Sequence, residues 1–435
     1  MSRKIGFWSV FALVTGSQIG SGVFMLPSSL APYGAFGLAG WILSGLGAVM
    51  LALVFAQLCA RLPRTGGPHV YVQEAFGPTM GFFTGWTYWI ISWVSSIAVI
   101  TASIGYLTPI IGEHSLFTHF ALEVGLLFII TWINLKGVKA AGNAEFFLSA
   151  LKMIPLLVLP IVALFFFKSS HIATVTPSAM GGTSHILSHV TLLTLWGFVG
   201  LESGTTPAGA VQNPSKTIPR AVILGTLCVA GLYFINSIGI MGALPASVLM
   251  NSKAPFADAT QAMFGGNWHL IISLIAAIVC IGTLNAWMLA SGQIALGVAQ
   301  DDLMPAFFAR TNKQGAPYCA LLVSCAGIVP LLFLTLNENI AQQINTIIDF
   351  SVICFLFVYV ICCGSLLKLL AKQQSKDWKI WLYSLCALSF CAWVISATPL
   401  KTIAVASLFV LSGIPIYFMQ RRKFNLEALP VGDTV

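Results

Sequence analysis

Charge is scarce in this sequence. Only 8% of the 435 residues are Asp, Glu, Lys or Arg, and 57% are hydrophobic, whereas a soluble domain carries about 25% charged residues. The mean hydropathy is +0.90, so water cannot be the main solvent of the chain. The shortage of charge excludes an ordinary soluble protein and predicts a membrane protein.

Further absences narrow the function. The ten cysteines lack metal-ligand spacing, and no His, Cys and Asp residues are spaced as a nucleophile and its base. We therefore expect no enzyme activity, no metal and no cofactor. The net charge is +8, but the basic residues are spread over loops rather than gathered in one patch, which argues against nucleic acid as a partner. No small-residue cleavage site follows the apolar N-terminal run, so we expect a retained first helix.

Long apolar runs are abundant. A spanning helix needs about 20 apolar residues, and the alternating segments of about ten residues that build membrane β-barrels are missing. Hydropathy therefore predicts an all-α membrane protein of about twelve transmembrane helices, forming a single membrane domain over 1–435. The predicted spans are 7–31, 36–60, 80–109, 116–134, 146–167, 189–211, 219–243, 265–299, 317–336, 341–369, 379–397 and 400–419.

The distribution of Lys and Arg predicts the orientation. With a cytoplasmic N-terminus, only Lys168, Lys253 and Lys401 fall in loops on the opposite side, and Lys152 falls within the fifth span; the other basic residues face the cytoplasm. This is a strong positive-inside bias. We expect a multi-pass protein of a bacterial-type inner membrane, with the lipid bilayer as partner, both termini cytoplasmic and 420–435 as a cytoplasmic tail. The oligomeric state is open between a monomer and a homodimer.

Two spans carry glycine and polar residues at membrane depth. The first contains Thr15 to Val23 with three glycines, and the sixth contains Leu195 to Gly209 with Glu202. An unwound turn frees backbone amides that a substrate carboxylate can satisfy at a helix N-terminus. A buried Glu is a functional candidate by default, whereas small residues alone also serve helix packing. Paired breaks in spans one and six indicate a substrate site at mid-membrane.

Several motifs, in order, resemble the amino acid–polyamine–organocation superfamily. They are Ile19 to Pro27, Gly66 to Tyr71, Ala75 to Pro78, Trp196 to Ser203, Asn213-Pro214, Pro255-Phe256 and Asp301 to Pro305. Within it the chain is most similar to the basic amino acid and polyamine antiporters, typified by the arginine/agmatine antiporter. The resemblance implies a leucine-transporter-like fold of two inverted five-helix repeats, here 1–170 and 185–370, with broken helices 1 and 6 and two additional helices over 379–419.

The resemblance also implies roles for individual residues. Ser21, with the backbone of Gly20 and Gly22, matches the segment that binds the substrate carboxylate, and carbonyls near Ile19, Trp196 and Val199 would receive the ammonium. Trp196 would close over the substrate, and a cationic side chain would stack on Trp287, a contact of about 2 kcal/mol or more when desolvated. Weaker matches are a hydroxyl contact at Ser351 and gating positions at Tyr88 and Tyr359, with Glu202 as the candidate for gating or proton coupling.

Two departures concern selectivity. Ser17 and Ser96 stand where the arginine/agmatine antiporter has asparagines, so the pocket is wider and its donors differ. The implied function is a secondary transporter that exchanges a basic amino acid for a related amino acid or its decarboxylated amine; the alternative is a proton-coupled symporter for neutral or small amino acids. A channel would need a continuous polar pore, which the sequence does not show.

Other titratable residues have simpler interpretations. Asp349 is either a proton or substrate group or an acid at a helix start, where the dipole favours it. Glu123 and Glu145 fit the same helix-start interpretation. His69, His185 and His189 fall in predicted loops, where we expect solvated side chains.

Overall fold

The structure, a computed structural model, describes residues 6–64, 67–113, 115–137, 156–206, 208, 211–334, 336 and 340–427. Every regular element within these ranges is a helix, and they contain no strand. Helices satisfy their own backbone hydrogen bonds, which is what the hydrocarbon core of a bilayer requires. The all-α prediction is confirmed.

Ten helical segments among the described residues are long and apolar enough to cross a membrane, and Tyr318–Leu334 is a shorter apolar helix. A helix over 156–164 forms the end of the predicted fifth span, whose earlier part, including Lys152 and Glu145, lies outside the described residues. These segments match the twelve predicted spans. The spanning helices are α1 (Phe7–Gln18) with α2 (Ser21–Leu30), α3 (Ala35–Arg61), α5 (Pro78–Val94) with α6 (Ser96–Ile111), α7 (Leu116–Leu135), α9 (Thr183–Leu195) with the 3-10 turns η4 (Trp196–Phe198) and η5 (Leu201–Thr205), α10 (Pro214–Ala243), α13 (Trp268–Gln300), α14 (Tyr318–Leu334), α15 (Ile340–Lys372), α16 (Trp378–Ser396), and α17 (Leu400–Leu411) with α18 (Ile414–Glu427).

Short elements connect the spans. Three of them begin with proline, whose fixed φ suits the first helical position. They are η1 (Ala31–Tyr33), α4 (Pro68–Phe76), η2 (Ser169–His171), η3 (Pro177–Met180), α11 (Ala246–Leu249), α12 (Pro255–Phe264) and η7 (Ala306–Ala309).

The sixth and seventh spans begin earlier than hydropathy predicts. The sixth starts at Thr183, not at 189, because the polar residues of its first turn lower the local hydropathy. The seventh starts at Pro214, which occupies the first helical turn, while Pro219 lies inside the helix. His185 and His189 are therefore helical residues of α9 rather than loop residues.

The helices divide into a central and a peripheral set. In the span Pro78–Ile111, 94% of the most apolar stretch is buried, against 11% in Leu400–Gln420. Large apolar side chains such as Phe117, Trp132 and Leu408 are exposed on the peripheral helices. In a bilayer that surface contacts lipid, so the exposed apolar faces need no protein partner.

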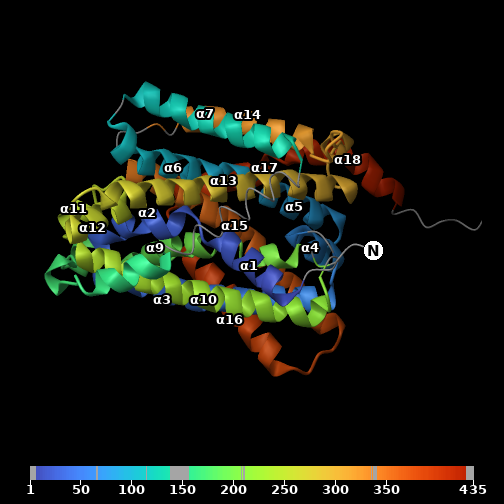
Figure 1. Cartoon of the computed structure of the whole chain (residues 1–435). Coiled ribbons are helices and arrows are strands. Elements are labelled where there is room, and N and C mark those ends of the chain that lie inside the picture. Colours follow the sequence, from blue (N-terminus) through green and yellow to red (C-terminus); the bar gives the residue numbers. More distant parts are fainter. Residues whose placement is uncertain are drawn as a thin grey trace, which may run out of the picture.

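Figure 1 shows the spans packed side by side with broadly aligned axes. The label of the N-terminus and α18 lie at the same end of the bundle, and α11 and α12 lie at the opposite end. The broken first span, α1 and α2, runs through the middle between α13 on one side and α10 on the other. The break is therefore held inside the bundle.

Candidate functional site

The first span is interrupted for two residues. α1 ends at Gln18, Ile19 (φ −74°, ψ 97°) and Gly20 (φ −138°, ψ −150°) are extended, and α2 begins at Ser21. An α-helix leaves its first N–H groups without intrahelical partners. The start of α2 therefore presents donors and the positive end of a helix at the centre of the bundle.

The sixth span is interrupted over a longer stretch. α9 ends at Leu195, η4 follows, Val199 is extended and Gly200 has a φ of +99°, which favours glycine. A Cβ at Gly200 would also lie 3.2 Å from Ser17 Oγ. Both the conformation and the close approach of α1 therefore require glycine at this position.

The two breaks contact each other directly. Ser17 Oγ, at the end of α1, donates to the Gly200 carbonyl at 2.9 Å and lies 2.6 Å from Ser203 Oγ. A Cβ at Gly22 would lie 3.0 Å from Trp196 Cδ1, so α2 packs against η4 without room for a side chain. The fold brings the two predicted interruptions to one place.

A small cavity lies where the breaks meet. Its volume is about 20 Å³, which is room for about one water molecule and not for an amino acid. Seven of the predicted substrate-binding residues line it. The lining residues are Ser17, Gln18, Gly20, Ser21, Gly22, Val99, Trp196, Val199, Thr283 and Trp287.

Two polar atoms in this lining are buried without a hydrogen-bond partner. They are Ser21 Oγ, on a residue with 2% exposure, and Gln18 Oε1, on a residue with 3% exposure. Leaving a buried polar group unsatisfied costs about 1–3 kcal/mol, and native proteins rarely do so without a functional reason. The first break thus retains hydrogen-bonding capacity that a ligand could use.

Neighbouring helices fix the unwound carbonyls of span one. Tyr233 Oη, on α10, donates to the Gln18 carbonyl at 2.6 Å, and Thr283 Oγ1, on α13, reaches the Ile19 carbonyl at 3.4 Å. In span six the Trp196 carbonyl accepts from the Val199 N–H at 3.3 Å. A substrate ammonium would share these carbonyls with the existing donors.

Glu202 connects three spans. Its carboxylate is fully buried and accepts from Tyr88 Oη at 2.7 Å and from Tyr359 Oη at 2.9 Å. Hydrogen bonds to an ionised acceptor contribute about 1.5–3 kcal/mol each. The three residues predicted as gating or coupling groups therefore form one contact, in which span six is tied to α5 of span three and α15 of span ten.

Three predicted binding residues lie outside the lining: Ile19, Ser96 and Ser351. Ser96 begins α6, is fully buried and donates back to the Ser92 carbonyl at 3.2 Å, while Val99, three residues on, reaches the cavity. Ser351 is also fully buried, and its Oγ has no hydrogen-bond partner. Their roles in binding stay predictions.

The sequence analysis did not select three lining residues: Gln18, Val99 and Thr283. Gln18 belongs to the polar segment already singled out in span one. Thr283 precedes Trp287 by four residues and therefore shares its helix face. Val99 is an ordinary apolar residue, and no local signal marks it.

Three titratable residues contradict their simple interpretations. His69 is 2% exposed, and its Nε2 lies 3.1 Å from Asp301 Oδ2, so it is not solvated. Glu123 is fully buried eight residues into α7, where it accepts from Thr101 Oγ1 at 2.6 Å. Asp349 is the tenth residue of α15, beyond the first turn in which the helix dipole favours an acid.

Among the described residues, no group of three or more His, Cys, Asp or Glu side chains could hold a metal ion. The chemistry that the site offers is hydrogen bonding, helix-end charge and aromatic contact, which suits reversible binding of a small molecule.

The fold defines a helical, multi-span membrane protein whose two broken helices meet at a small cavity. Residues 5–419 match the amino acid permease family, and the chain belongs to this family. The putative arginine/ornithine antiporter of Bacillus subtilis (strain 168) is 30% identical over 411 residues, with 86% of each chain covered.

Two relatives from Escherichia coli (strain K12) are also similar. The cadaverine/lysine antiporter is 28% identical over 438 residues, covering 98% of this chain and 97% of that protein. The putrescine transporter PotE is 28% identical over 367 residues, covering 84% and 83%. The similarity extends over most of the chain in all three relatives.

Proposed function

We propose that this chain is a secondary antiporter that exchanges a basic amino acid for a related amino acid or for its decarboxylated amine. The observation that carries the proposal is the unsatisfied, buried polar surface where the two breaks meet, at Ser21 and Gln18. The relatives, whose names describe antiporters of arginine and ornithine and of cadaverine and lysine, support this substrate class.

Each part of the substrate has a matching group. The α-carboxylate would bind at the start of α2, where Ser21 Oγ and the N–H groups around Gly20 and Gly22 supply donors. The side chain would extend toward Trp287, whose ring also lies 5.9 Å from the ring of Phe355. A cation over an indole is stabilised without a carboxylate partner. Decarboxylated amines would retain the second contact and lose the first.

Transport requires the cavity to open. Because its volume is about 20 Å³, substrate entry needs the helices around the breaks to separate. The contact of Glu202 with Tyr88 and Tyr359 would close one side of the cavity and would have to break on opening. A buried carboxylate in this place could also couple protonation to gating.

Exchange and proton-coupled uptake are separated by one experiment. Purified protein in proteoliposomes is loaded with ornithine, lysine, cadaverine, leucine or buffer, and uptake of each labelled compound is followed. Antiport predicts rapid uptake only with a loaded interior and only for basic compounds. Uptake into empty vesicles that depends on a pH gradient would support the symporter alternative.

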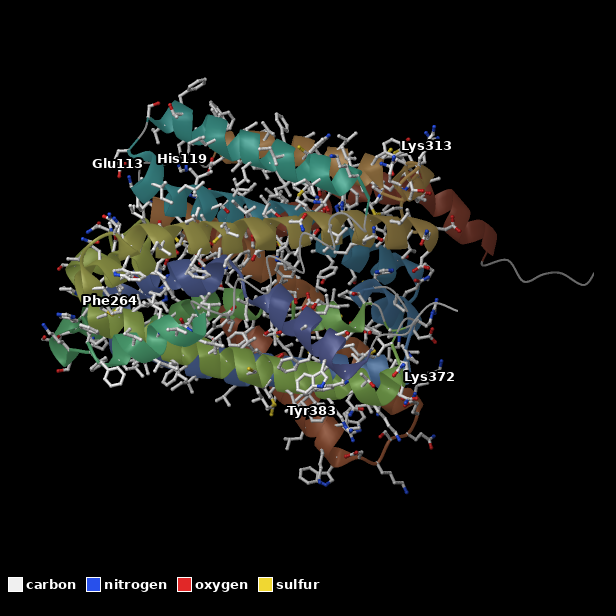
Figure 2. All side chains as sticks on the ribbon, in the orientation of Figure 1. Glu113, His119, Phe264, Lys313, Lys372 and Tyr383 are labelled. Carbon is white, nitrogen blue, oxygen red and sulfur yellow. The ribbon has the colours of Figure 1, made fainter. Side chains whose placement is uncertain are left out.

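The orientation is part of the proposal. Figure 2 shows Lys313 and Lys372 toward the end of the bundle where the N-terminus lies in Figure 1, and Glu113 toward the opposite end. Excess Lys and Arg mark the cytoplasmic side, so both termini would be cytoplasmic in an inner membrane. Introduced cysteines near Lys313 and Lys372 should react with a thiol reagent only from the cytoplasmic side. Labelling from the outer side would show that the orientation is the opposite one. A homodimer stays a prediction, for which crosslinking in the membrane is the test.

A further inference from the structure

A second cavity, an apolar groove, lies away from the broken helices. Its volume is about 420 Å³, against about 20 Å³ for the cavity at the breaks. Three helices form its walls: the helix over 156–164 at the end of the fifth span, α12, and the first turns of α13. The proposed exchange does not use this groove, because none of its described lining residues also lines the cavity at the breaks.

The chemistry of the lining excludes water and amino acids as occupants. None of the described lining residues is charged, so an ammonium or carboxylate group would find no partner there. Thr260 supplies the one hydroxyl among them, and its Oγ1 donates to the Phe256 carbonyl at 2.7 Å. Apolar cavities without available polar partners stay dry. The groove therefore suits a hydrocarbon.

The groove opens on the surface that faces lipid. Its lining residues Val158, Phe264 and Trp268 are exposed, and the apolar surface continues over Ile161 and Ile271 of the same helices. In a bilayer, hydrocarbon chains surround this surface. An empty groove would leave its lining without dispersion contacts on one side, so a neighbouring lipid chain is the occupant that the surroundings supply.

The groove lies near one end of the bundle. Figure 2 shows Phe264 toward the end that carries Glu113 and away from Lys372, which is the outer end in the proposed orientation. Trp268 is the first residue of α13, and tryptophan favours the level of the lipid headgroups. From Trp268 to Ile275 the helix rises by about 10 Å. The groove thus runs from the headgroup level into the hydrocarbon.

A basic residue lies beyond the groove on the fifth span. Lys168 follows Val162, a lining residue, by six positions, and its N–H donates to the carbonyl of Gly242 at the end of α10. Its side chain is exposed and forms no ion pair with a described residue. A lysine at the membrane surface attracts the phosphate of a lipid. An apolar helix of a second copy would offer no such negative charge.

We propose that this groove binds one acyl chain of a phospholipid whose phosphate lies at the level of Trp268 and Lys168. The lipid would fill the space between the fifth span and α13. Because α13 also carries Thr283 and Trp287 of the cavity lining, the bound chain would support one wall of the candidate site. The inference does not depend on which compound the protein exchanges.

The test is lipid binding to the full chain, delipidated in dodecylmaltoside and titrated with palmitoyl-oleoyl phosphatidylglycerol, as followed by native mass spectrometry. Wild type should bind a single lipid saturably. Ile272→Trp fills the groove and should weaken binding about tenfold or more. Ile271→Trp is the matched control, because Ile271 is exposed and lies outside the lining; its affinity should stay within about twofold of wild type. Lys168→Gln should weaken binding about threefold.

Three outcomes would overturn the proposal: no saturable binding by the wild type, equal binding by the two isoleucine variants, or a wild-type dimer without lipid that dissociates in Ile272→Trp. The last would assign the groove to a second copy. If Ile272→Trp does not fold, Val162→Trp fills the groove from the fifth span, with Ile161→Trp as its control. Failure of the proposed exchange would leave this measurement unchanged, because it involves no transported compound.

Discussion

The two broken spans differ in how their polar groups are satisfied. At the first break, Ser21 Oγ and Gln18 Oε1 are buried and unpaired. At the second, both oxygens of Glu202 accept hydrogen bonds, and the Gly200 carbonyl accepts from Ser17. The first break therefore has free capacity for a ligand, whereas the second is already occupied by contacts within the protein.

This difference suggests separate roles, binding and gating, for two glycine-containing breaks that look alike in sequence. An unsatisfied buried polar atom is unfavourable until a ligand supplies its hydrogen-bond partner, so the first break suits binding. Contacts that link span six to spans three and ten hold one arrangement of helices, so the second break suits gating. Variants of each break should therefore change different measured quantities.

The largest effect is expected at Gly22. Gly22→Leu places a side chain where a Cβ alone lies 3.0 Å from Trp196 and 3.5 Å from the Gly197 backbone, so substrate affinity should fall about 100-fold or more, as measured by calorimetry. Gly231→Leu is the control, because nothing lies within 4 Å of a Cβ there. Wild-type affinity in a folded Gly22→Leu protein would rule out the first break as the site.

Glu202→Gln should affect gating more than binding. The amide offers one acceptor oxygen in place of two, so one tyrosine contact is weakened, and a loss of about 1.5 kcal/mol would change the exchange rate about tenfold. Affinity should change less than threefold. Rates across pH 5–8 in proteoliposomes give the readout. An unchanged rate and pH profile would leave Glu202 with a structural role only.

Trp287→Leu probes the contribution of the unbroken eighth span. If Trp287 supports a side-chain cation, affinity for arginine, ornithine and agmatine should fall about tenfold more than affinity for leucine, corresponding to a cation–π contact of about 1–2 kcal/mol. Equal losses for the two classes would mean that only apolar packing was removed. That result, or no wild-type affinity for any cation, would end the basic-substrate proposal.

The smallest effect is expected at the pair of His69 and Asp301, which does not line the cavity. The hydrogen bond with His69 is the main cause of a lowered pKa of Asp301, and the charges of His69 and Arg64 act in the same direction while partial burial opposes them. A lowered carboxyl pKa stabilises the fold above the ordinary pKa of 3.8 and loses this effect as pH falls through the lowered value.

Because Asp301 is 34% exposed, solvent screening limits the effect to about 0.5 kcal/mol. Asp301→Asn should therefore lower the unfolding temperature in detergent slightly at pH 7, and its difference from the wild type should shrink below pH 3.8. A difference of the same size at pH 7 and pH 3 would show that the charge of Asp301 is not involved.

Sequence predicted the parts of this architecture that depend on local signals. The length of the apolar runs located the spans, and glycines with polar neighbours located both breaks, since these residue types permit a helix to unwind within a membrane. The observed first residues of two spans, Thr183 and Pro214, precede the predicted ones, because polar residues or prolines in the first turn lower the local hydropathy.

Contacts between distant segments could not be predicted from the sequence in the same way. His69 was expected in solvent because its neighbours along the chain look like a loop, yet Asp301 covers it from 232 positions away. Val99 rather than Ser96 reaches the cavity because the rotation of α6 is set by packing, which hydropathy does not record. The difference in hydrogen bonding between the polar groups of the two breaks likewise depends on contacts that form only in the folded protein.

The most direct test compares Ser21→Ala with Ser203→Ala by calorimetric substrate binding and thermal unfolding in the same detergent. Ser21→Ala should lower substrate affinity about fivefold, the value of one hydrogen bond of about 1 kcal/mol, and leave the unfolding temperature unchanged, because Ser21 Oγ has no partner in the protein. Ser203→Ala should do the reverse, since it removes the contact with Ser17. Equal losses of affinity, or a loss confined to Ser203→Ala, would contradict the assignment of binding to the first break.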